Sequence, residues 1–143
     1  MIPLLFQYEN CFFSNDLKKY ICKNQIKKGK SGTRNLLKLF KENFSVALMI
    51  DQRVSEGQKV NFFGKLALTT TLPAQLAIKY DLGIIPVFIK RIENNKFKIE
   101  FQKEINARNF KDKFILTATL NKVLEDMIIK NPNQWIWTHN RWK

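Results

Sequence analysis

Apolar residues recur along the first half of the chain in two patterns, one helical and one continuous. Between Ser31 and Glu42 they fall at intervals of three and four residues, which predicts an amphipathic helix. The next segment, SVALMI at residues 45–50, is an unbroken apolar run and is typical of a strand buried on both faces. A loop with Gly57 and Gly64 should follow it.

The second half of the chain alternates between helical and extended patterns. Helical spacing predicts helices over residues 69–80 and 112–130, while residues 84–91 and 96–101 are typical of two strands joined by a short turn. Pro86 interrupts the first of these strands, which indicates a bulge or an edge position. This succession predicts an α/β fold in which a mixed sheet is flanked by helices.

Length and composition indicate one folded domain. The chain has 143 residues, a hydrophobic fraction of 45% and 12 Phe, enough for a core but too short for two ordinary domains, so residues 1–143 are expected to form a single domain. With Cys11 and Cys22 as the only cysteines and His139 as the only histidine, we expect no disulfide framework, no metal, no cofactor and a reducing compartment. No apolar run approaches the roughly 20 residues of a membrane-spanning helix.

The formal net charge of +13 favours a polyanionic partner. Nucleic acid, anionic lipid headgroups and a phosphorylated glycolipid all have the required charge. Lys, Asn, Ile and Phe are abundant together, and these are the residues of A/T-rich codons, so codon bias is an alternative source of the excess Lys.

Three segments together resemble the late acyltransferases of lipid A biosynthesis, the lauroyl and myristoyl transferases. They are MIDQRVSEGQKVNFFGKLALTT at 49–70, IIPVFIKR at 84–91 and NPNQWIWTHNRWK at 131–143. The resemblance implies a glycerolipid-acyltransferase-like fold. It also implies transfer of a fatty acyl chain from acyl carrier protein to a hydroxyl of a lipid A precursor, at the cytoplasmic face of the bacterial inner membrane.

The family's catalytic base is a histidine in an HxxxxD or HxxxxE motif, in which the acid orients the imidazole. His139 is followed only by Asn, Arg, Trp and Lys, so it does not form this motif. The resemblance places the motif and a membrane helix upstream of Met1. The chain is therefore expected to be the C-terminal part of such an enzyme, incomplete at the N-terminus and bound peripherally to the anionic membrane surface.

Asp51 is the candidate catalytic residue. It follows the predicted buried strand and, by resemblance, matches an acid that the family needs for activity, where it would orient a basic residue or a donor near the reacting thioester and hydroxyl. The alternative is an aspartate that caps a turn or a helix. Gln52, next to it, is a candidate substrate-binding residue.

Two further groups are candidates for substrate binding. Lys30, Arg34 and Lys38 recur at helical spacing on one face and could meet the phosphates of the acceptor or the acidic carrier protein, although a solvated face explains them almost as well. Phe62, Phe63 and Gly64 match the family's FFG, interpreted as the wall of an acyl-chain groove with glycine allowing close approach. Ordinary aromatic core is the alternative.

The C-terminal segment combines aromatic and cationic residues. His139 and Arg141 stand among three tryptophans, a composition that suits the headgroup zone of a membrane, and the alternative is a terminal strand that seals the core.

Two other functions remain as alternatives for the whole chain. One is a non-catalytic, membrane-associated remnant of the family, favoured by the missing HxxxxD/E motif. The other is a nucleic-acid module, which would need the aromatic residues of KFKIEF, at 96–101, to stack on bases. The sequence contains no recognised RNA- or DNA-binding motif, so nucleic acid is not the expected partner.

Overall fold

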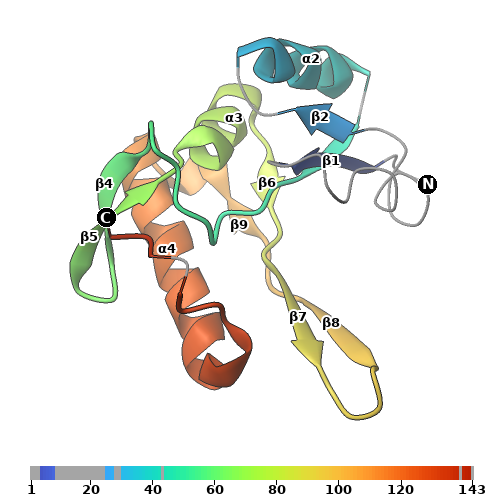
Figure 1. Cartoon of the computed structure of the whole chain (residues 1–143). Coiled ribbons are helices and arrows are strands. Elements are labelled where there is room, and N and C mark those ends of the chain that lie inside the picture. Colours follow the sequence, from blue (N-terminus) through green and yellow to red (C-terminus); the bar gives the residue numbers. More distant parts are fainter. Residues whose placement is uncertain (1–3, 9–24, 28–29, 43, 139, 143) are drawn as a thin grey trace. The chain divides into compact units, whose positions relative to one another are not determined.

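A computed structural model describes residues 4–8, 25–27, 30–42, 44–138 and 140–142 (Figure 1). The chain forms two compact units, Met1–Met49 and Ile50–Lys143. Each unit is described by itself.

In its described residues, the first unit combines a small parallel sheet with the helix α2. Strand β1 lies between β2 and β3 and is parallel to both. The helix α2 confirms the prediction for residues 31–42 to within one residue. The predicted strand at 45–50 ends earlier, at Ala47, and its residues are exposed or half-buried, so the expectation of a strand buried on both faces was wrong. The elements are β1 (Leu4–Tyr8), β2 (Gln25–Lys27), α2 (Lys30–Lys41) and β3 (Ser45–Ala47).

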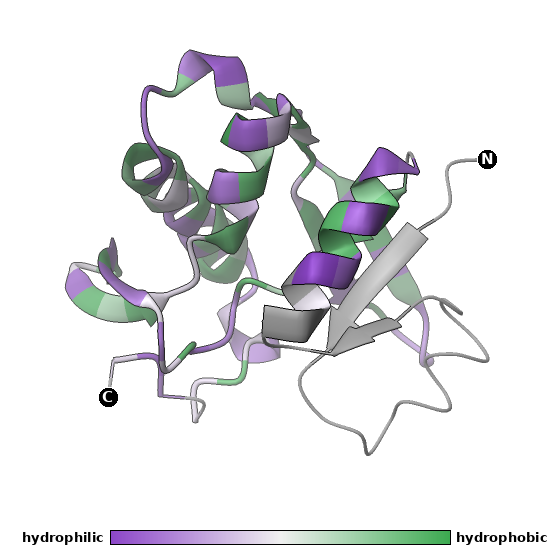
Figure 2. Cartoon of the chain, turned by 90° about the horizontal axis from the view of Figure 1, so that it is seen from above, coloured by the Kyte–Doolittle hydropathy of each residue, from purple (hydrophilic) through white to green (hydrophobic). Residues whose placement is uncertain are grey.

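Helix α2 is amphipathic, as its spacing predicts. Leu36 is fully buried, whereas Arg34 and Lys38, two residues before and two residues after it, are exposed. Figure 2 shows hydrophilic and hydrophobic stretches alternating along this helix.

The second unit contains two α-helices and three separate antiparallel strand pairs. The pairs are β4 with β5, β6 with β9, and β7 with β8. The described chain is therefore mixed α/β, as expected, but its strands form several small sheets instead of one mixed sheet flanked by helices. The elements are β4 (Gln58–Phe62), β5 (Lys65–Thr69), α3 (Leu72–Tyr80), β6 (Gly83–Ile84), β7 (Val87–Arg91), β8 (Phe97–Phe101), β9 (Ile105–Asn106), η2 (Ala107–Asn109), α4 (Lys113–Lys130) and η3 (Pro132–Gln134).

The segment predicted to be a loop around Gly57 and Gly64 contains the β4–β5 hairpin. Its two-residue turn, Phe63–Gly64, has φ of 51° and 75°, and positive φ at both central residues is the signature of a type I′ turn. Val60 and Phe62 alternate inward along β4, so one face of the hairpin packs on α4 (Figure 1).

The end of α3 and the start of α4 are each marked by an aspartate. Asp81 follows α3 with φ 54°, in the left-handed conformation common after a helix, which confirms the predicted stop. Asp112 precedes α4, and its carboxylate accepts hydrogen bonds from the backbone N–H of Phe114 and Ile115, at 2.6 and 3.0 Å. Helix α4 thus confirms the prediction for residues 112–130.

Pro86 separates β6 from β7, which confirms the expected interruption of the strand at residues 84–91. Beyond it, β7 and β8 form the predicted hairpin, with Val87 opposite Phe101 and Ile89 opposite Ile99. None of the helices in the described residues is long and apolar enough to cross a membrane.

Two clusters of buried side chains hold the second unit together. One joins α3 to α4 through Ala74, Ala77, Ala107, Leu116 and Leu120. The other joins the β4–β5 hairpin to the end of α4 through Phe62, Ala67 and Ile128, and Trp135 and Trp142 pack against it. The second cluster positions the site described below.

Candidate functional site

Arg141 is a fully buried cation in the second unit, with 0% of its surface exposed. Its guanidinium carbon lies 4.1 Å from the centroid of the Phe62 ring, a cation–π contact. Its backbone carbonyl accepts a hydrogen bond from the N–H of Leu68 at 3.2 Å, which ties the C-terminal segment to β5. An arginine cannot lose its charge in a protein, so this charge needs compensation within the core.

Thr69 and Asn121 supply polar contacts to the guanidinium. Nη2 of Arg141 donates to Oγ1 of Thr69 at 3.1 Å and to Oδ1 of Asn121 at 3.4 Å. Nδ2 of Asn121 donates to Oγ1 of Thr69 at 3.2 Å and to the backbone carbonyl of Asn61 at 2.9 Å. Thr69, Asn121 and Arg141 are all nearly inaccessible to solvent, and we refer to them as the polar core cluster.

Two donors of the polar core cluster are left over. Within the described part of the chain, neither Nε nor Nη1 of Arg141 has a hydrogen-bond partner. Burial lowers the pKa of the Arg141 guanidinium below its usual value, and the negative charge of Asp51 acts in the opposite direction. The Nε–H lies parallel to an N–H of Nη2, and such a pair of donors matches the two oxygens of a carboxylate.

Asp51 and Gln52 lie in a bend and are half-buried. The segment that carries them returns to β5, because the N–H of Val54 reaches the carbonyl of Leu68 at 3.4 Å. Gly57 allows a close approach there. A Cβ at this position would lie 2.8 to 2.9 Å from backbone atoms of Thr69 and Val54.

The aromatic residues around the site form one cluster. Phe62 lies at its centre, with ring centroids 4.8 Å from Phe63, 5.8 Å from Trp135 and 5.7 Å from Trp142. The indole N–H of Trp142 donates to the carbonyl of Phe62 at 3.1 Å. Trp137 extends the cluster outward, 5.9 Å from Phe63, and is 48% exposed.

The three residues that match FFG have different environments. Phe62 is buried and Phe63 half-buried, and the N–H of Phe63 donates to Oε1 of Glu125 at 2.7 Å. An added Cβ at Gly64 would meet no atom within 4 Å, so glycine is needed there for its positive φ and not for a close approach.

The other candidate residues are distributed as follows. Lys30 is the first residue of α2, and Arg34, on the same helix, is exposed. His139 lies outside the described residues. The C-terminal segment is a 3₁₀ turn followed by irregular chain, and its Trp135 and Trp142 seal the core without forming a strand.

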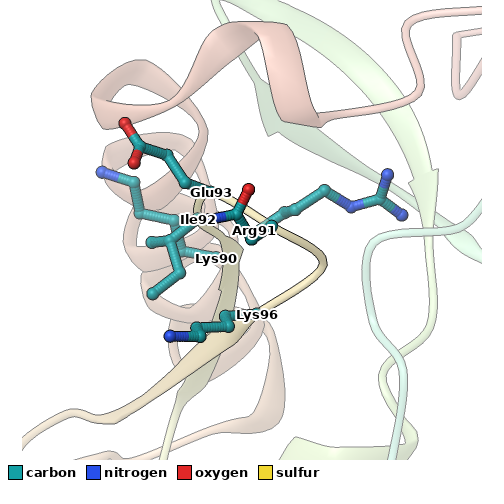
Figure 3. Close-up of a pocket in the computed structure, with 6 residues that line it drawn as sticks. Lys90, Arg91, Ile92, Glu93 and Lys96 are labelled. Atoms are coloured by element: carbon teal, nitrogen blue, oxygen red, sulfur yellow. The ribbon is translucent and has the colours of Figure 1, made fainter.

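A hollow of about 430 Å³ lies at the β7–β8 turn and is lined by Lys90, Arg91, Ile92, Glu93, Asn94 and Lys96. Figure 3 shows Arg91 extending to one side, while Lys90, Glu93 and Lys96 extend to the other. Gln134 ties the end of β7 to the C-terminal segment. Its side chain accepts a hydrogen bond from the N–H of Arg91 at 2.8 Å and donates one to the carbonyl of Arg91 at 3.0 Å. In the described residues no group of three His, Cys, Asp or Glu side chains could hold a metal ion.

These features define a mixed α/β protein with a charged core site between a hairpin, a long helix and the C-terminal segment. The sequence profile described as bacterial lipid A biosynthesis acyltransferase matches residues 22–143, and the chain belongs to this family. The match includes all three segments that carried the resemblance. No curated protein matches the chain.

Thr69 and Asn121 are site residues that were not identified from the sequence. Asn121 is a polar residue among apolar neighbours in α4, four residues after the buried Thr117, and this interruption of the apolar stripe was the available signal. Thr69 gave no such signal, because a threonine near a helix start is ordinarily a cap.

Proposed function

We propose that the chain takes part in transferring a fatty acyl chain from acyl carrier protein to a hydroxyl of a lipid A precursor. The observation that carries this proposal is the family match over residues 22–143, which includes Asp51 and the whole second unit. The polar core cluster next to the segment of Asp51 supports it, because buried charge is costly and is commonly kept for function.

The reaction is an attack of the acceptor hydroxyl on the thioester carbonyl of the donor. The hydroxyl oxygen forms an ester with the acyl carbon, the C–S bond breaks, and the hydroxyl proton passes through a base to the departing thiolate of the carrier. His139 is followed by no carboxylate, so we place the base outside these 143 residues. Asp51 would orient a donor or a basic residue near the reacting atoms.

Exposed cations could recognise the anionic substrates. Arg34 and Lys38 are both exposed on α2 and lie four residues apart, on one face. Phosphates of a glycolipid acceptor and the acidic surface of a carrier protein are both complementary to such a face.

An apolar surface of the β7–β8 hairpin could hold the chain at the cytoplasmic face of the inner membrane. Its side chains are 46 to 73% exposed and belong to strand positions that point the same way. Arg91, opposite Phe97, belongs to the same side of the strand pair, and each cation near an anionic bilayer contributes about 1 kcal/mol to binding. We call this surface the hairpin face; it consists of Val87, Ile89, Phe97, Ile99 and Phe101.

The test is an acyl-transfer assay with acyl carrier protein loaded with a fatty acid and a phosphorylated, partly acylated glucosamine disaccharide. DNA immediately upstream of Met1 is read first for an in-frame or frameshifted segment that encodes HxxxxD or HxxxxE, and the joined chain is assayed beside the 143-residue chain. Mass spectrometry should show the acceptor gaining one acyl chain. Asp51→Asn should abolish the gain, and Asp126→Asn, a change at an exposed acid of α4, should not.

The second candidate function is a non-catalytic, membrane-associated remnant of the family. The absence of an HxxxxD/E motif in the 143 residues favours it. It predicts binding to anionic vesicles with no acyl transfer by either chain at any protein concentration. Transfer by the joined chain would exclude it.

A further inference from the structure

The buried charge of Arg141 has too few partners for its environment. One nitrogen, Nη2, shares two hydrogen bonds with neutral groups of Thr69 and Asn121, and the ring of Phe62 covers the guanidinium at 4.1 Å. The Nε and Nη1 donors have no partner within the described residues. Removing a cation from water costs several kcal/mol unless an anion and further hydrogen bonds compensate it.

Because Arg141 is 0% exposed, an acid of the protein is better placed than an ion from solvent to compensate its charge. Of the acids near the polar core cluster, Glu125 already accepts from the N–H of Phe63 at 2.7 Å and from Nζ of Lys122 at 3.2 Å. Asp51 is the acid whose charge acts on the guanidinium. It is half-buried and belongs to the same unit of the chain.

The backbone around Asp51 brings it toward Arg141. Leu68 bonds to both segments, since its carbonyl accepts from Val54 at 3.4 Å and its N–H donates to the carbonyl of Arg141 at 3.2 Å. Gly57 packs on the backbone of Thr69, the residue whose hydroxyl holds the guanidinium. The segment from 51 to 57 therefore lies against the strand that carries the arginine's partner.

We propose that the Asp51 carboxylate is the internal counter-ion of Arg141 and closes onto its free Nε donor. Arg141 is then a positioning residue: its buried guanidinium fixes the orientation of the Asp51 carboxylate. The interaction concerns the folded protein itself. It holds whether or not the chain transfers acyl groups, and its test does not depend on that activity.

The first experiment is a double-mutant cycle measured by thermal unfolding of the full 143-residue chain, with Asp51→Asn, Arg141→Met and the double variant. Asp51→Asn should lower the midpoint by about 5 °C or more in the wild-type background, because it leaves a buried charge unpaired. In the Arg141→Met background it should lower the midpoint by much less. Equal losses in the two backgrounds would overturn the proposal.

A second measurement remains decisive if Arg141→Met does not fold. The Nε–H of Arg141 is followed by NMR in the wild type, in Asp51→Asn and in the control Asp126→Asn, whose native acid pairs with exposed Lys122 at 3.3 Å. Asp51→Asn should shift this resonance and speed its exchange with solvent, whereas the control should leave it unchanged. A resonance unaffected by Asp51→Asn would contradict the pairing.

Discussion

Arg141 and Phe62 lie in direct contact, with the guanidinium carbon 4.1 Å from the ring centroid and both side chains fully buried. The ring replaces water over one face of the cation, and Thr69 and Asn121 contact one of its nitrogens. The same ring is the centre of the aromatic cluster, so the packing of the hairpin and the electrostatics of the site depend on one side chain.

Truncation of Phe62 should therefore be among the most destabilising single changes in the second unit. Phe62→Ala removes the ring from a fully buried position and exposes the guanidinium to a cavity, and we expect a loss of about 3–5 kcal/mol in the free energy of unfolding. Urea denaturation measures it. Phe101→Ala, at a side chain that is 73% exposed, is the matched control and should change the free energy by less than about 0.5 kcal/mol.

The hydroxyl of Thr69 accepts two hydrogen bonds of the polar core cluster, from Asn121 at 3.2 Å and from Arg141 at 3.1 Å. Thr69→Val keeps the side-chain volume but removes the acceptor of both hydrogen bonds, so Asn121 and Arg141 each lose one partner. We expect a loss of about 1–3 kcal/mol in the free energy of unfolding. Thr69→Ser keeps the hydroxyl and should lose less. A larger loss in Thr69→Ser than in Thr69→Val would show that the methyl group, and not the hydroxyl, is what Thr69 contributes.

Helices could be predicted more closely than sheets. In α2 and in α4 the apolar residues are spaced so that one face of the helix is buried. Both helices lie within one residue of the expected ends. The β4–β5 hairpin lies where a loop is expected, because its turn residues, Phe63 and Gly64, do not form one of the usual Asn-Gly or Asp-Gly turn pairs. The arrangement of the strands into separate pairs depends on tertiary contacts that periodicity does not record.

The candidate site could be predicted only in part. The residues Asp51, Phe62 and Arg141 were identified from the sequence, but their environments were not. Arg141 was expected among the headgroups of a membrane, with a terminal strand that seals the core as the alternative, and the structure buries its side chain completely. Burial of a charge requires partners from three separate segments, Thr69, Asn121 and Phe62, and no local pattern indicates their convergence.

Gly64 provides a test of backbone conformation that is free of packing effects. Its φ is 75°, and an added Cβ would meet no atom within 4 Å, so Gly64→Ala should cost about 1 kcal/mol through conformation alone. Asparagine tolerates this conformation better, and Gly64→Asn should cost only part of that amount. Urea denaturation of the two variants measures the difference. A loss in Gly64→Asn as large as in Gly64→Ala would contradict this explanation.

Asp81 should make stability depend on pH in the acid range. Nε of Arg108 donates to both carboxylate oxygens, at 2.6 and 2.9 Å, and this hydrogen bonding, with the positive charge of Arg108, lowers the pKa of Asp81 below its ordinary 3.8. A lowered folded pKa means that the pair stabilises the protein above the unfolded pKa. This stabilisation is lost as the pH falls from about 3.8 through the folded pKa.

Asp81→Asn removes the charge and keeps a residue that accepts the positive φ of 54°. Thermal midpoints of this variant and the wild type should differ at pH 6 and converge as the pH is lowered below about 3.8. The difference at pH 6 should be small and should shrink in high salt, because the pair is exposed. A difference that stays constant across the acid range would show that the charge of Asp81 is not involved.

The hairpin face should determine binding to anionic bilayers if the membrane association proposed above is correct. Ile99 and Phe101 are 56% and 73% exposed and lie on the same side of β8. Replacing both by serine removes apolar area that would enter the interface, and we expect about a tenfold to hundredfold weaker partition onto vesicles that contain phosphatidylglycerol. Sedimentation with the vesicles measures the bound fraction.

Ile129→Ser is the matched control for this pair, because Ile129 is 59% exposed but lies on α4. Its partition should stay within about twofold of the wild type. Binding of all variants should fall with added salt, since Arg91 and the other exposed cations of this basic chain contribute by charge. If Ile129→Ser weakens partition as much as the double change in β8, the membrane contact is a general property of exposed apolar residues in this chain and not of the hairpin face.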